Sequence, residues 1–278
     1  MSAVALVCVR NEALHARACV GDFVRQGVDV ILIDNDSTDG SIAAIREEFL
    51  GKGLLSIERL PWRGAFSLTE QLSVKKKLIE SVSHGWIIHA DADEWLQAPP
   101  EYGTLMDGIR AADGAGFNCI NFLEFVFLPR PGENFEVDNY RSLMRDYYFF
   151  HPSHPRLVRA WKRSAGFDNS ASGGHTVAGG EVRLFPRDFI LRHYIALSET
   201  HFRGKYSGRT FAAEDLASGF HGNRRMTTAG DLSIPSGLPF LTLERPQSPA
   251  FSTASPKHLH FWDWPEYAGT RRLLQHRP

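Results

Sequence analysis

Four short apolar runs, separated by helical patterns, constrain the fold of this chain more than any other feature of its sequence. The runs are rich in Val, Ile and Leu and predict strands at residues 4–9, 28–33, 54–60 and 86–90. Between them, helices are predicted from an Asn11 cap to about residue 26, over 42–50 and over 68–82. Continuous apolar runs are typical of strands buried on both faces. The alternating order therefore predicts an α/β fold with a mostly parallel central sheet flanked by helices.

Polar residues follow three of the four predicted strands. The three polar tips are Arg10-Asn11-Glu12, Asp34-Asn35-Asp36 and Asp91-Ala92-Asp93-Glu94. Sheets covered by helices bind ligands beyond the carboxyl ends of their strands. Because the predicted topology brings these tips to one edge, we expect a binding site there.

The third tip has the composition of a divalent-cation site. Side chains alternate along an extended strand, so we expect Asp91 and Asp93 to point the same way. Two carboxylates held that close repel each other unless a cation lies between them. Their oxygens suit Mg²⁺ or Mn²⁺, which keep other positions for water and substrate phosphates. The alternative interpretation is a polar strand end that leads into a loop.

Composition argues against several other classes of protein. The 278 residues suffice for one large domain or one domain with an appendage, and the formal net charge of −1 favours neither nucleic acid nor an anionic membrane as a partner. No apolar run approaches the roughly 20 residues of a membrane span, and the first nine residues make a poor signal peptide. Cys8, Cys19 and Cys119 are scattered and odd in number, which favours reduced core thiols in a cytoplasmic protein.

The second half of the chain has a less regular pattern. It predicts strands at residues 117–128 and 156–160, a hairpin of 182–185 with 189–194, and a helix that Ser198 caps and that runs through Lys205. Residues 167–180 are rich in Gly, Ser and Asn, so we expect a mobile loop that could close over a site.

Several of these motifs together resemble a known family. The first strand with its tip, residues 33–41 and residues 89–95 resemble the family 2-like glycosyltransferases, which have the GT-A fold. Later stretches resemble the branch related to the family 92 enzymes: Pro155-Arg156-Leu157-Val158-Arg159, Gly174-His175 and Arg192-His193-Tyr194, with Ser198 and Lys205. The resemblance covers about residues 3–210 and implies a transferase with a role in polysaccharide biosynthesis.

The resemblance implies which residues bind a nucleotide-sugar donor. In the family, the acidic tip after the second strand contacts uracil and ribose, and this role falls on Asp34, with Asn35 and Asp36 beside it. The chain after the first strand lines the same pocket, here Val9, Arg10, Asn11 and Glu12. Lys205 could reach the diphosphate, and its alternative is surface charge on a helix.

The resemblance also implies a metal site that binds Mn²⁺ or Mg²⁺. The first acid of the motif, Asp91, lies by the ribose and the metal, and Asp93 binds the metal. Many GT-A enzymes supply a later histidine, for which His193 is the matching candidate. The alternative for His193 is a hydrogen-bonded core histidine.

A catalytic base must take the proton of the attacking hydroxyl. In many family 2 members an acidic pair further along the chain supplies this base, and no matching pair is identified in this sequence. The candidates are Glu94, which follows the metal tip, and His175, Glu181 and Asp168 around the glycine-rich loop. Glu94 equally suits the orientation of an acceptor hydroxyl.

Basic residues have simpler interpretations. Residues 75–77 are predicted as a solvated helix face, with a phosphate contact as the alternative. Arg156 and Arg159 are out of phase along their strand, so at most one is expected to face the cleft.

The predicted domain organisation is one principal domain with a tail. Residues 1–215 form the glycosyltransferase-like domain, with a nucleotide-binding half over about 1–98 and an acceptor-side half over 99–215. Residues 216–278 form an extension that wraps the domain. Its aromatic stretch, residues 261–265, is interpreted as a packed terminus, with a sugar-stacking platform as the alternative.

The sequence thus predicts a metal-dependent glycosyltransferase without a membrane span. It would move a sugar from a nucleotide-sugar to a hydroxyl of a carbohydrate or other acceptor. The resemblance implies that the donor is UDP-linked and that the anomeric carbon is inverted. One alternative is a non-catalytic protein of the same fold that binds nucleotide-sugars or glycans. The other is a metal-dependent nucleotidyltransferase or phosphohydrolase, although the first strand's tip, Arg10-Asn11-Glu12, lacks an aspartyl nucleophile.

Overall fold

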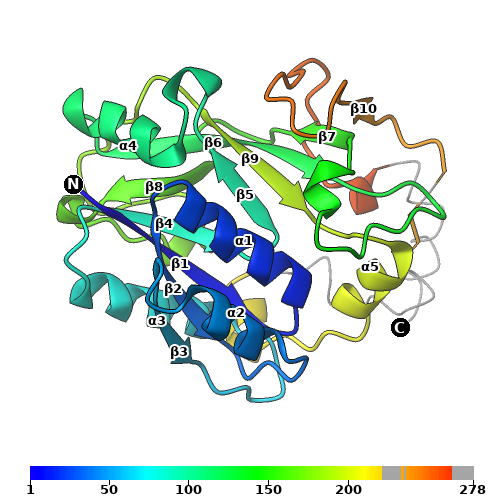
Figure 1. Cartoon of the computed structure of the whole chain (residues 1–278), viewed down its shortest axis with the longest axis horizontal. Coiled ribbons are helices and arrows are strands. Elements are labelled where there is room, and N and C mark those ends of the chain that lie inside the picture. The colour runs from blue at the N-terminus through cyan, green and yellow to red at the C-terminus, as the bar shows by residue number, and fades with distance from the viewer. Residues whose placement is uncertain (221–232, 235, 265–278) are drawn as a thin grey trace. The chain divides into compact units, whose positions relative to one another are not determined.

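The computed structural model describes residues 1–220, 233–234 and 236–264, and the chain divides into two compact units (Figure 1). The first unit consists of Met1–Arg63, Ser67–Leu123 and Pro155–Leu191. The second consists of Gly64–Phe66, Glu124–His154 and Arg192–Pro278. The first unit is discontinuous in sequence, since the chain leaves it within one strand and later returns to add another.

The first unit has an α/β fold, as predicted. In chain order its helices and strands are β1 (Ala3–Val9), α1 (Ala13–Arg25), β2 (Asp29–Asp34), α2 (Ser41–Phe49), β3 (Leu54–Arg59), α3 (Leu68–Ser81), β4 (Trp86–Asp91), β5 (Glu94–Gln97), α4 (Leu105–Gly114), the start of β6 (Cys119–Phe127), β8 (Leu157–Lys162) and the start of β9 (Phe189–Tyr194). Short 3-10 turns lie at Pro100–Tyr102, Arg163–Ala165 and Ser170–Ser172.

The sheet of this unit has the strand order β6-β8-β4-β1-β2-β3. Its first four predicted strands pair in parallel, since β1 lies between β2 and β4 and β2 continues to β3. Strands β8 and β6 extend the sheet in antiparallel pairing. The parallel prediction is therefore confirmed for the first part of the chain, and the later strands make the sheet mixed.

Helices cover both faces of the parallel strands, and Figure 1 shows α1 and α2 in front of β1 and β2. Side chains of β1 alternate between two cores: Val7 packs in one cluster with Phe23 of α1 and Ile109 of α4. Its neighbour Leu6 packs in the other cluster with Leu78 of α3. Burial on both faces explains why these strands read as continuous apolar runs.

Three of the described helices begin with a side-chain cap, whereas others, α1 among them, do not. The side chains of Ser67, Thr104 and Ser198 accept backbone hydrogen bonds at the starts of α3, α4 and α5 (Glu199–Tyr206). The predicted Asn11 cap of α1 is wrong, because the N-cap is Glu12. The Asn11 side chain instead accepts a hydrogen bond from the Thr38 N–H, 2.7 Å away.

The predicted hairpin of residues 182–185 with 189–194 is also wrong. Only the second segment is a strand, β9, and it pairs with β5 and β6. The first segment makes an isolated bridge between Leu184 and Cys119. β9 pairs with two strands from earlier in the chain, β5 and β6, instead of with the segment that precedes the turn at Pro186.

The second unit is built on antiparallel strands and an aromatic core. Its elements are the end of β6, a 3-10 turn (Tyr140–Ser142), β7 (Asp146–Phe150), the end of β9, α5 (Glu199–Tyr206), α6 (Ala213–Ala217), β10 (Leu241–Thr242) and a 3-10 turn (Phe261–Asp263). β7 lies between β6 and β10. Phe261, Trp262 and Trp264 are buried in one cluster with Phe202 of α5. The packed-terminus interpretation is thus confirmed, and Pro265 lies outside the described residues.

All three cysteines are buried thiols, and none forms a disulfide. Burial raises the pKa of Cys8 and of Cys119 to about 11 in each case. Among the described helices, none combines the length and apolar content that crossing a membrane would require.

Candidate functional site

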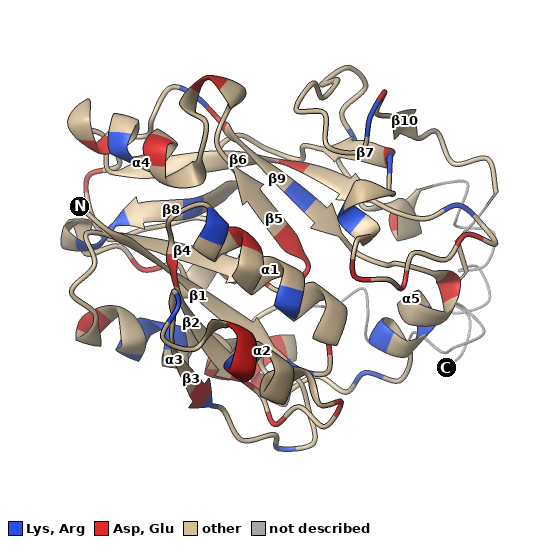
Figure 2. Ribbon diagram, viewed as in Figure 1, with Lys and Arg blue, Asp and Glu red and all other residues tan. Residues whose placement is uncertain are grey.

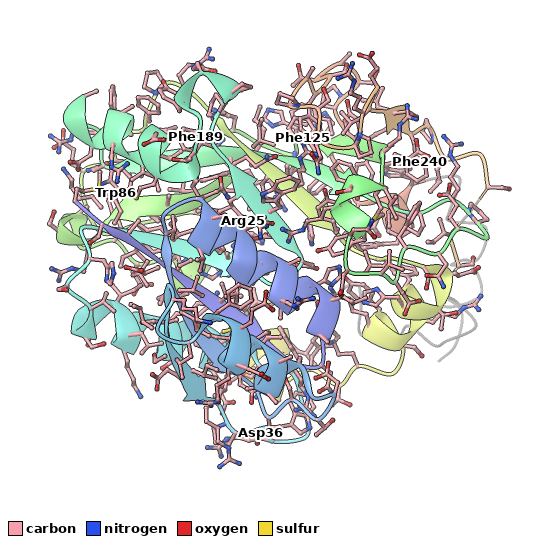
Figure 3. All side chains as sticks on the ribbon, in the orientation of Figure 1. Arg25, Asp36, Trp86, Phe125, Phe189 and Phe240 are labelled. Atoms are coloured by element: carbon pink, nitrogen blue, oxygen red, sulfur yellow. The ribbon has the colours of Figure 1, made fainter. Side chains whose placement is uncertain are left out.

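Strand register brings the three predicted tips to one edge of the first unit. Val9 at the end of β1 pairs with Asp34 of β2, and Cys8 pairs with Asp91 of β4. Asp34 and Asp91 therefore flank β1 on strands that are about 10 Å apart, at roughly 4.8 Å for each strand spacing. Figure 3 shows Asp36 near this carboxyl edge, and Trp86, which begins β4, near the other end of the strands.

The tips of β1 and β2 are tied together by Arg10. Its guanidinium donates to the carbonyl oxygens of Asn35 and Asp36, at 2.5 and 2.6 Å, and lies 3.9 Å from the centre of the Trp62 ring. The Asp36 carboxylate accepts from the Trp62 N–H and forms an ion pair with Arg59, which lowers its pKa. Figure 2 shows both acidic and basic residues on the loops at the bottom of the view.

Two residues at this edge adopt the left-handed backbone conformation although they are not glycine. Asn11 and Asp36 both have φ of 53°. The contacts around them are well defined: Asn11 N–H donates to Ser37 Oγ, and Ser37 N–H donates to an oxygen of Asp34 at 2.9 Å. Strained backbone of this kind concentrates at functional sites, where the surrounding contacts hold it in place.

The predicted donor-binding residues differ in what their side chains contact. The side chains of Arg10, Asn35 and Asp36 bond to the loop itself, since the Asn35 amide donates to Leu60 O. Glu12 contacts the His15 ring at 3.1 Å. Val9 is buried, and its carbonyl accepts from the Asn35 N–H.

Asp91 and Asp93 do not lie on one extended strand, which corrects the alternation argument. β4 ends at Asp91, a turn follows at Ala92 and Asp93, and β5 begins at Glu94. The Asp91 side chain is 47% exposed, whereas Asp93 and Glu94 are buried. The turn gives each acid a separate environment.

Arg159 of β8 joins two of these acids. Its Nη2 donates to Glu94 Oε1 and lies 3.3 Å from Asp91 Oδ2, and its Nη1 donates to Gly174 O at 3.1 Å. Glu94 Oε2 accepts from the Asp91 N–H at 3.0 Å. Arg156 precedes β8, and Arg159 within the strand contacts the acidic tip.

A second buried cation lies behind the tip. Lys75 of α3 is 3% exposed, donates to Ala90 O at 3.1 Å and lies 3.3 Å from His89 Nε2. The predicted solvated face is thus wrong for Lys75, because α3 packs this residue against β4. Burial, and then the charges of Lys75 and Arg159, lower the pKa of His89 well below its ordinary value, so His89 is neutral near pH 7.

The glycine-rich loop packs against the same tip. The Asn169 amide lies 3.1 Å from His89 Nδ1, and Asp168 pairs through its backbone with Ala178. Asp168 also forms an ion pair with Lys76 of α3 at 2.6 Å. This pair, with the Ser170 N–H, lowers the pKa of Asp168 to about 2.

The four candidate bases occupy different places. Glu94 is buried against Arg159, and Asp168 is held as a strongly ionised carboxylate by Lys76. The Glu181 carbonyl accepts a hydrogen bond from the Asn118 side chain, and the Asn118 carbonyl accepts one from the Lys162 N–H. Lys162 pairs with Trp86, the first residue of β4. The structure thus places Glu181 at the opposite end of β4 from Asp91.

His175 is exposed and follows Gly174, whose carbonyl accepts from Arg159 beside the acidic tip. Its carbonyl accepts from the Val158 N–H of β8, and its charge contributes to the lowered pKa of His89. Among the four candidate bases, it is the exposed titratable group close to the carboxyl end of β4.

Two predicted residues belong to the second unit. His193 Nδ1 bonds to the buried carboxylate of Glu124 at 2.7 Å. A carboxylate on one ring nitrogen is the usual support of a histidine that ligates a metal through the other. Lys205 lies on α5, with its Nζ 5.8 Å from the centre of the Tyr206 ring.

The β4 tip fits a divalent cation that a bound phosphate would complete. Asp91 presents a partly exposed carboxylate, and Mg²⁺-type cations commonly take one or two carboxylates and fill their other positions with water and phosphate. Among the described residues, no three His, Cys, Asp or Glu side chains gather into a metal-binding group. The donor set therefore suits a cation shared with a ligand, rather than a cage of protein groups alone.

Comparisons with known proteins find distant structural likeness. No protein-family model matches the sequence, and no curated protein matches it significantly. Among solved structures, S. aureus TarS in complex with UDP is similar with a TM-score of 0.45 and 11% identity, over 70% of this chain and 61% of that chain. In a second TarS structure, the coverage is 37% of that chain.

Two further structures are similar at the same level. Mannosyltransferase PcManGT from Pyrobaculum calidifontis, in complex with GDP-Man and Mn²⁺, has a TM-score of 0.39 and 15% identity, over 73% of this chain and 59% of that chain. GalNAc-T7 with UDP, GalNAc and Mn²⁺ has a TM-score of 0.40 and 10% identity, over 83% and 55%. This chain thus spans less than two thirds of the length of these proteins, and likeness at these scores carries no argument about its activity.

Sequence reasoning missed the buried network behind the tip. The signals were present: Arg159 is a charged residue within the largely buried strand β8, and His89 is a polar residue within β4. A charge inside a buried strand must be paired, and for Arg159 the partners are the acids of the β4 tip, 65 and 68 positions earlier in the chain. Lys75 gave no such signal, because it lies in a run of three lysines on a helix.

Proposed function

We propose that this protein is a GT-A-type glycosyltransferase that uses a nucleotide-sugar donor. The observation that carries the proposal is the convergence of the β1, β2 and β4 tips at one edge, with Asp34 and Asp91 on either side of β1. A separation of about 10 Å between their strands suits a nucleoside at Asp34 and its diphosphate at Asp91. The sequence resemblance to family 2-like enzymes of the family 92 branch supports the same roles.

Asp91 would hold a divalent cation together with the donor diphosphate, and Asp93 is the second proposed ligand. A bound Mn²⁺ or Mg²⁺ would neutralise the charge that develops on the leaving diphosphate. Asp34 would orient the nucleoside, since one of its oxygens is already fixed by the Ser37 N–H. The contacts of Arg10 with Asn35 and Asp36 keep this part of the pocket formed. For His193, which lies in the second unit, a ligand role stays a prediction from the resemblance.

His175 is the general base that the geometry of the first unit favours. Glu94 is engaged with Arg159, and Asp168 is too weak a base with a pKa of about 2. Glu181 lies at the amino end of β4. His175→Gln should lower the rate of sugar transfer by about 100-fold or more and leave donor affinity within a factor of about two. Equal losses in both quantities would argue against a base.

A UDP-linked donor, a carbohydrate or other hydroxyl acceptor and inversion at the anomeric carbon complete the proposal. These parts rest on the resemblance to the family. The three thiols, which form no disulfide, support a reducing compartment such as the cytoplasm.

A screen of nucleoside diphosphates and their sugars by thermal shift tests the proposal. A ligand at 100 times its dissociation constant should stabilise the protein by about 2.7 kcal/mol. We expect stabilisation by UDP or a UDP-sugar that depends on Mn²⁺, and slow hydrolysis of the sugar donor without acceptor. Binding without hydrolysis or transfer would favour a non-catalytic protein. No stabilisation by any nucleotide would contradict the proposal.

A further inference from the structure

We propose that Arg159 is a positioning residue, which with Glu94 sets the orientation of Asp91 for the metal-bound donor. Glu94 then has a supporting role and is not the base. This inference rests on the proposed function and deepens it. It assigns one joint role to Arg159 and Glu94, which lie 65 positions apart in the sequence.

The fold explains why Arg159 reaches the acidic tip. β8 is antiparallel to β4, and Ile88 pairs with Ala160, so Arg159 is the next residue along β8 toward the carboxyl end of β4. Its neighbours Val158 and Ala160 are buried, and Arg159 itself is only 3% exposed. A guanidinium at this depth requires partners, and the tip of β4 supplies them.

Both oxygens of the Glu94 carboxylate are engaged. Oε1 accepts from Arg159 Nη2, and Oε2 accepts from the Asp91 N–H at 3.0 Å. Glu94 is 2% exposed, so an acceptor hydroxyl would have to displace these contacts in order to reach it. The geometry thus fits a residue that fixes the Asp91 backbone, and it does not fit a residue that takes a proton from a substrate.

Arg159 adds a contact to the Asp91 side chain and another to the glycine-rich loop. Nη2 lies 3.3 Å from Asp91 Oδ2, and Nη1 donates to Gly174 O at 3.1 Å. A planar guanidinium can hold these three groups in one arrangement, whereas an ammonium cannot reproduce the fork. Loss of Arg159 would release the carboxylate of Asp91 and leave Glu94 as a buried, unbalanced charge.

The test measures the affinity for UDP in the presence of Mn²⁺ by calorimetry in the full-length protein, first for the wild type. Arg159→Met, Arg159→Lys and Glu94→Gln should each weaken binding by about 10- to 100-fold, the usual effect of losing a group that orients a metal ligand. Arg163→Met is the matched control, since Arg163 is exposed and donates to His84 O at the amino end of β4. It should bind UDP as the wild type does.

The combined variant separates positioning from catalysis. If the two residues act as one unit, Glu94→Gln with Arg159→Met should bind no more weakly than the weaker single variant. If Glu94 were instead the catalytic base, it would act on the acceptor, and Glu94→Gln would leave the affinity for UDP unchanged. This result would overturn the inference. Folding is checked by circular dichroism, and Glu94→Gln keeps the shape of the side chain should the arginine variants unfold.

The wild-type titration separates the two proposals. If the wild type fails to bind any nucleoside diphosphate, the proposed function is wrong and the inference falls with it. If the wild type binds UDP and all three single variants bind equally well, only the positioning role is wrong.

Discussion

At the scale of single residues, the acids near this site differ in what holds them. Glu94 is buried against an arginine, Asp36 is bonded to Arg59 and Trp62, and Asp91 is half-exposed at the end of its strand. Asp168 is paired with Lys76 at the surface. Sequence spacing could not distinguish these environments, because each depends on a partner from another element.

Asp168→Asn should destabilise the protein in a pH-dependent way. The carboxyl pKa falls from its usual 3.8 to about 2 on folding, so its stabilisation is complete above about pH 4 and is lost as the pH falls toward 2. The pair is partly exposed, so the expected loss at pH 7 is about 0.2 to 1 kcal/mol. Urea unfolding at pH 7 and pH 3 measures it. A difference from wild type that grows toward low pH would contradict the assignment.

The cysteines should resist modification in the native state. Burial raises the pKa of Cys8 and Cys119 to about 11, so the reactive thiolate is scarce at pH 8. We expect a colorimetric thiol reagent to label them only after denaturant is added, when all three thiols react. Rapid labelling of Cys8 or Cys119 without denaturant would show that these residues are not buried.

At the scale of elements, the glycine-rich loop depends on one close approach. A Cβ at Gly174 would lie 2.8 Å from atoms of the His89 ring, and its φ of +87° suits glycine. Gly166, at the start of the same region, has φ of +66° but no atom within 4 Å of a Cβ. The two positions separate the cost of the backbone conformation from the cost of the contact.

Gly174→Ala should therefore destabilise the protein more than Gly166→Ala. The control carries only the left-handed backbone cost of about 1 to 2 kcal/mol. The clash with His89 should add about 1 to 3 kcal/mol at Gly174. Chemical denaturation measures both, and equal losses would mean that the loop does not pack on β4 as described.

Local sequence patterns predicted the helices and strands that have a clear apolar run or cap. The first four strands and three helices were predicted from apolar runs and caps, and the structure confirms each of them within about two residues. β5 and α4 were missed, because four strand residues after a tight turn and a helix with glycine and aspartate give weak periodic signals. The partner of β9 was missed because a sequence shows the nearest turn and not the competing strand.

At the scale of the whole molecule, the chain builds its first unit from three separate segments. Asp34, Asp91 and Arg159 come from the first, second and third of these segments, respectively. The sequence predicted that the strand tips would meet, because parallel topology fixes which ends share an edge. It could not predict the return of β8, which depends on pairing between residues far apart in the chain.

The central claim is that the carboxylate of Asp91 binds a divalent cation, and that this cation binds the diphosphate of a donor whose nucleoside lies at Asp34. The direct test is calorimetric titration of UDP, with and without Mn²⁺, into the wild type, Asp91→Asn and Glu47→Gln, an exposed acid on α2 that serves as the control. We predict Mn²⁺-dependent binding in the wild type and the control, and a loss of at least about 10-fold in Asp91→Asn. Binding that is equally tight in all three proteins, or that needs no metal, would contradict the account.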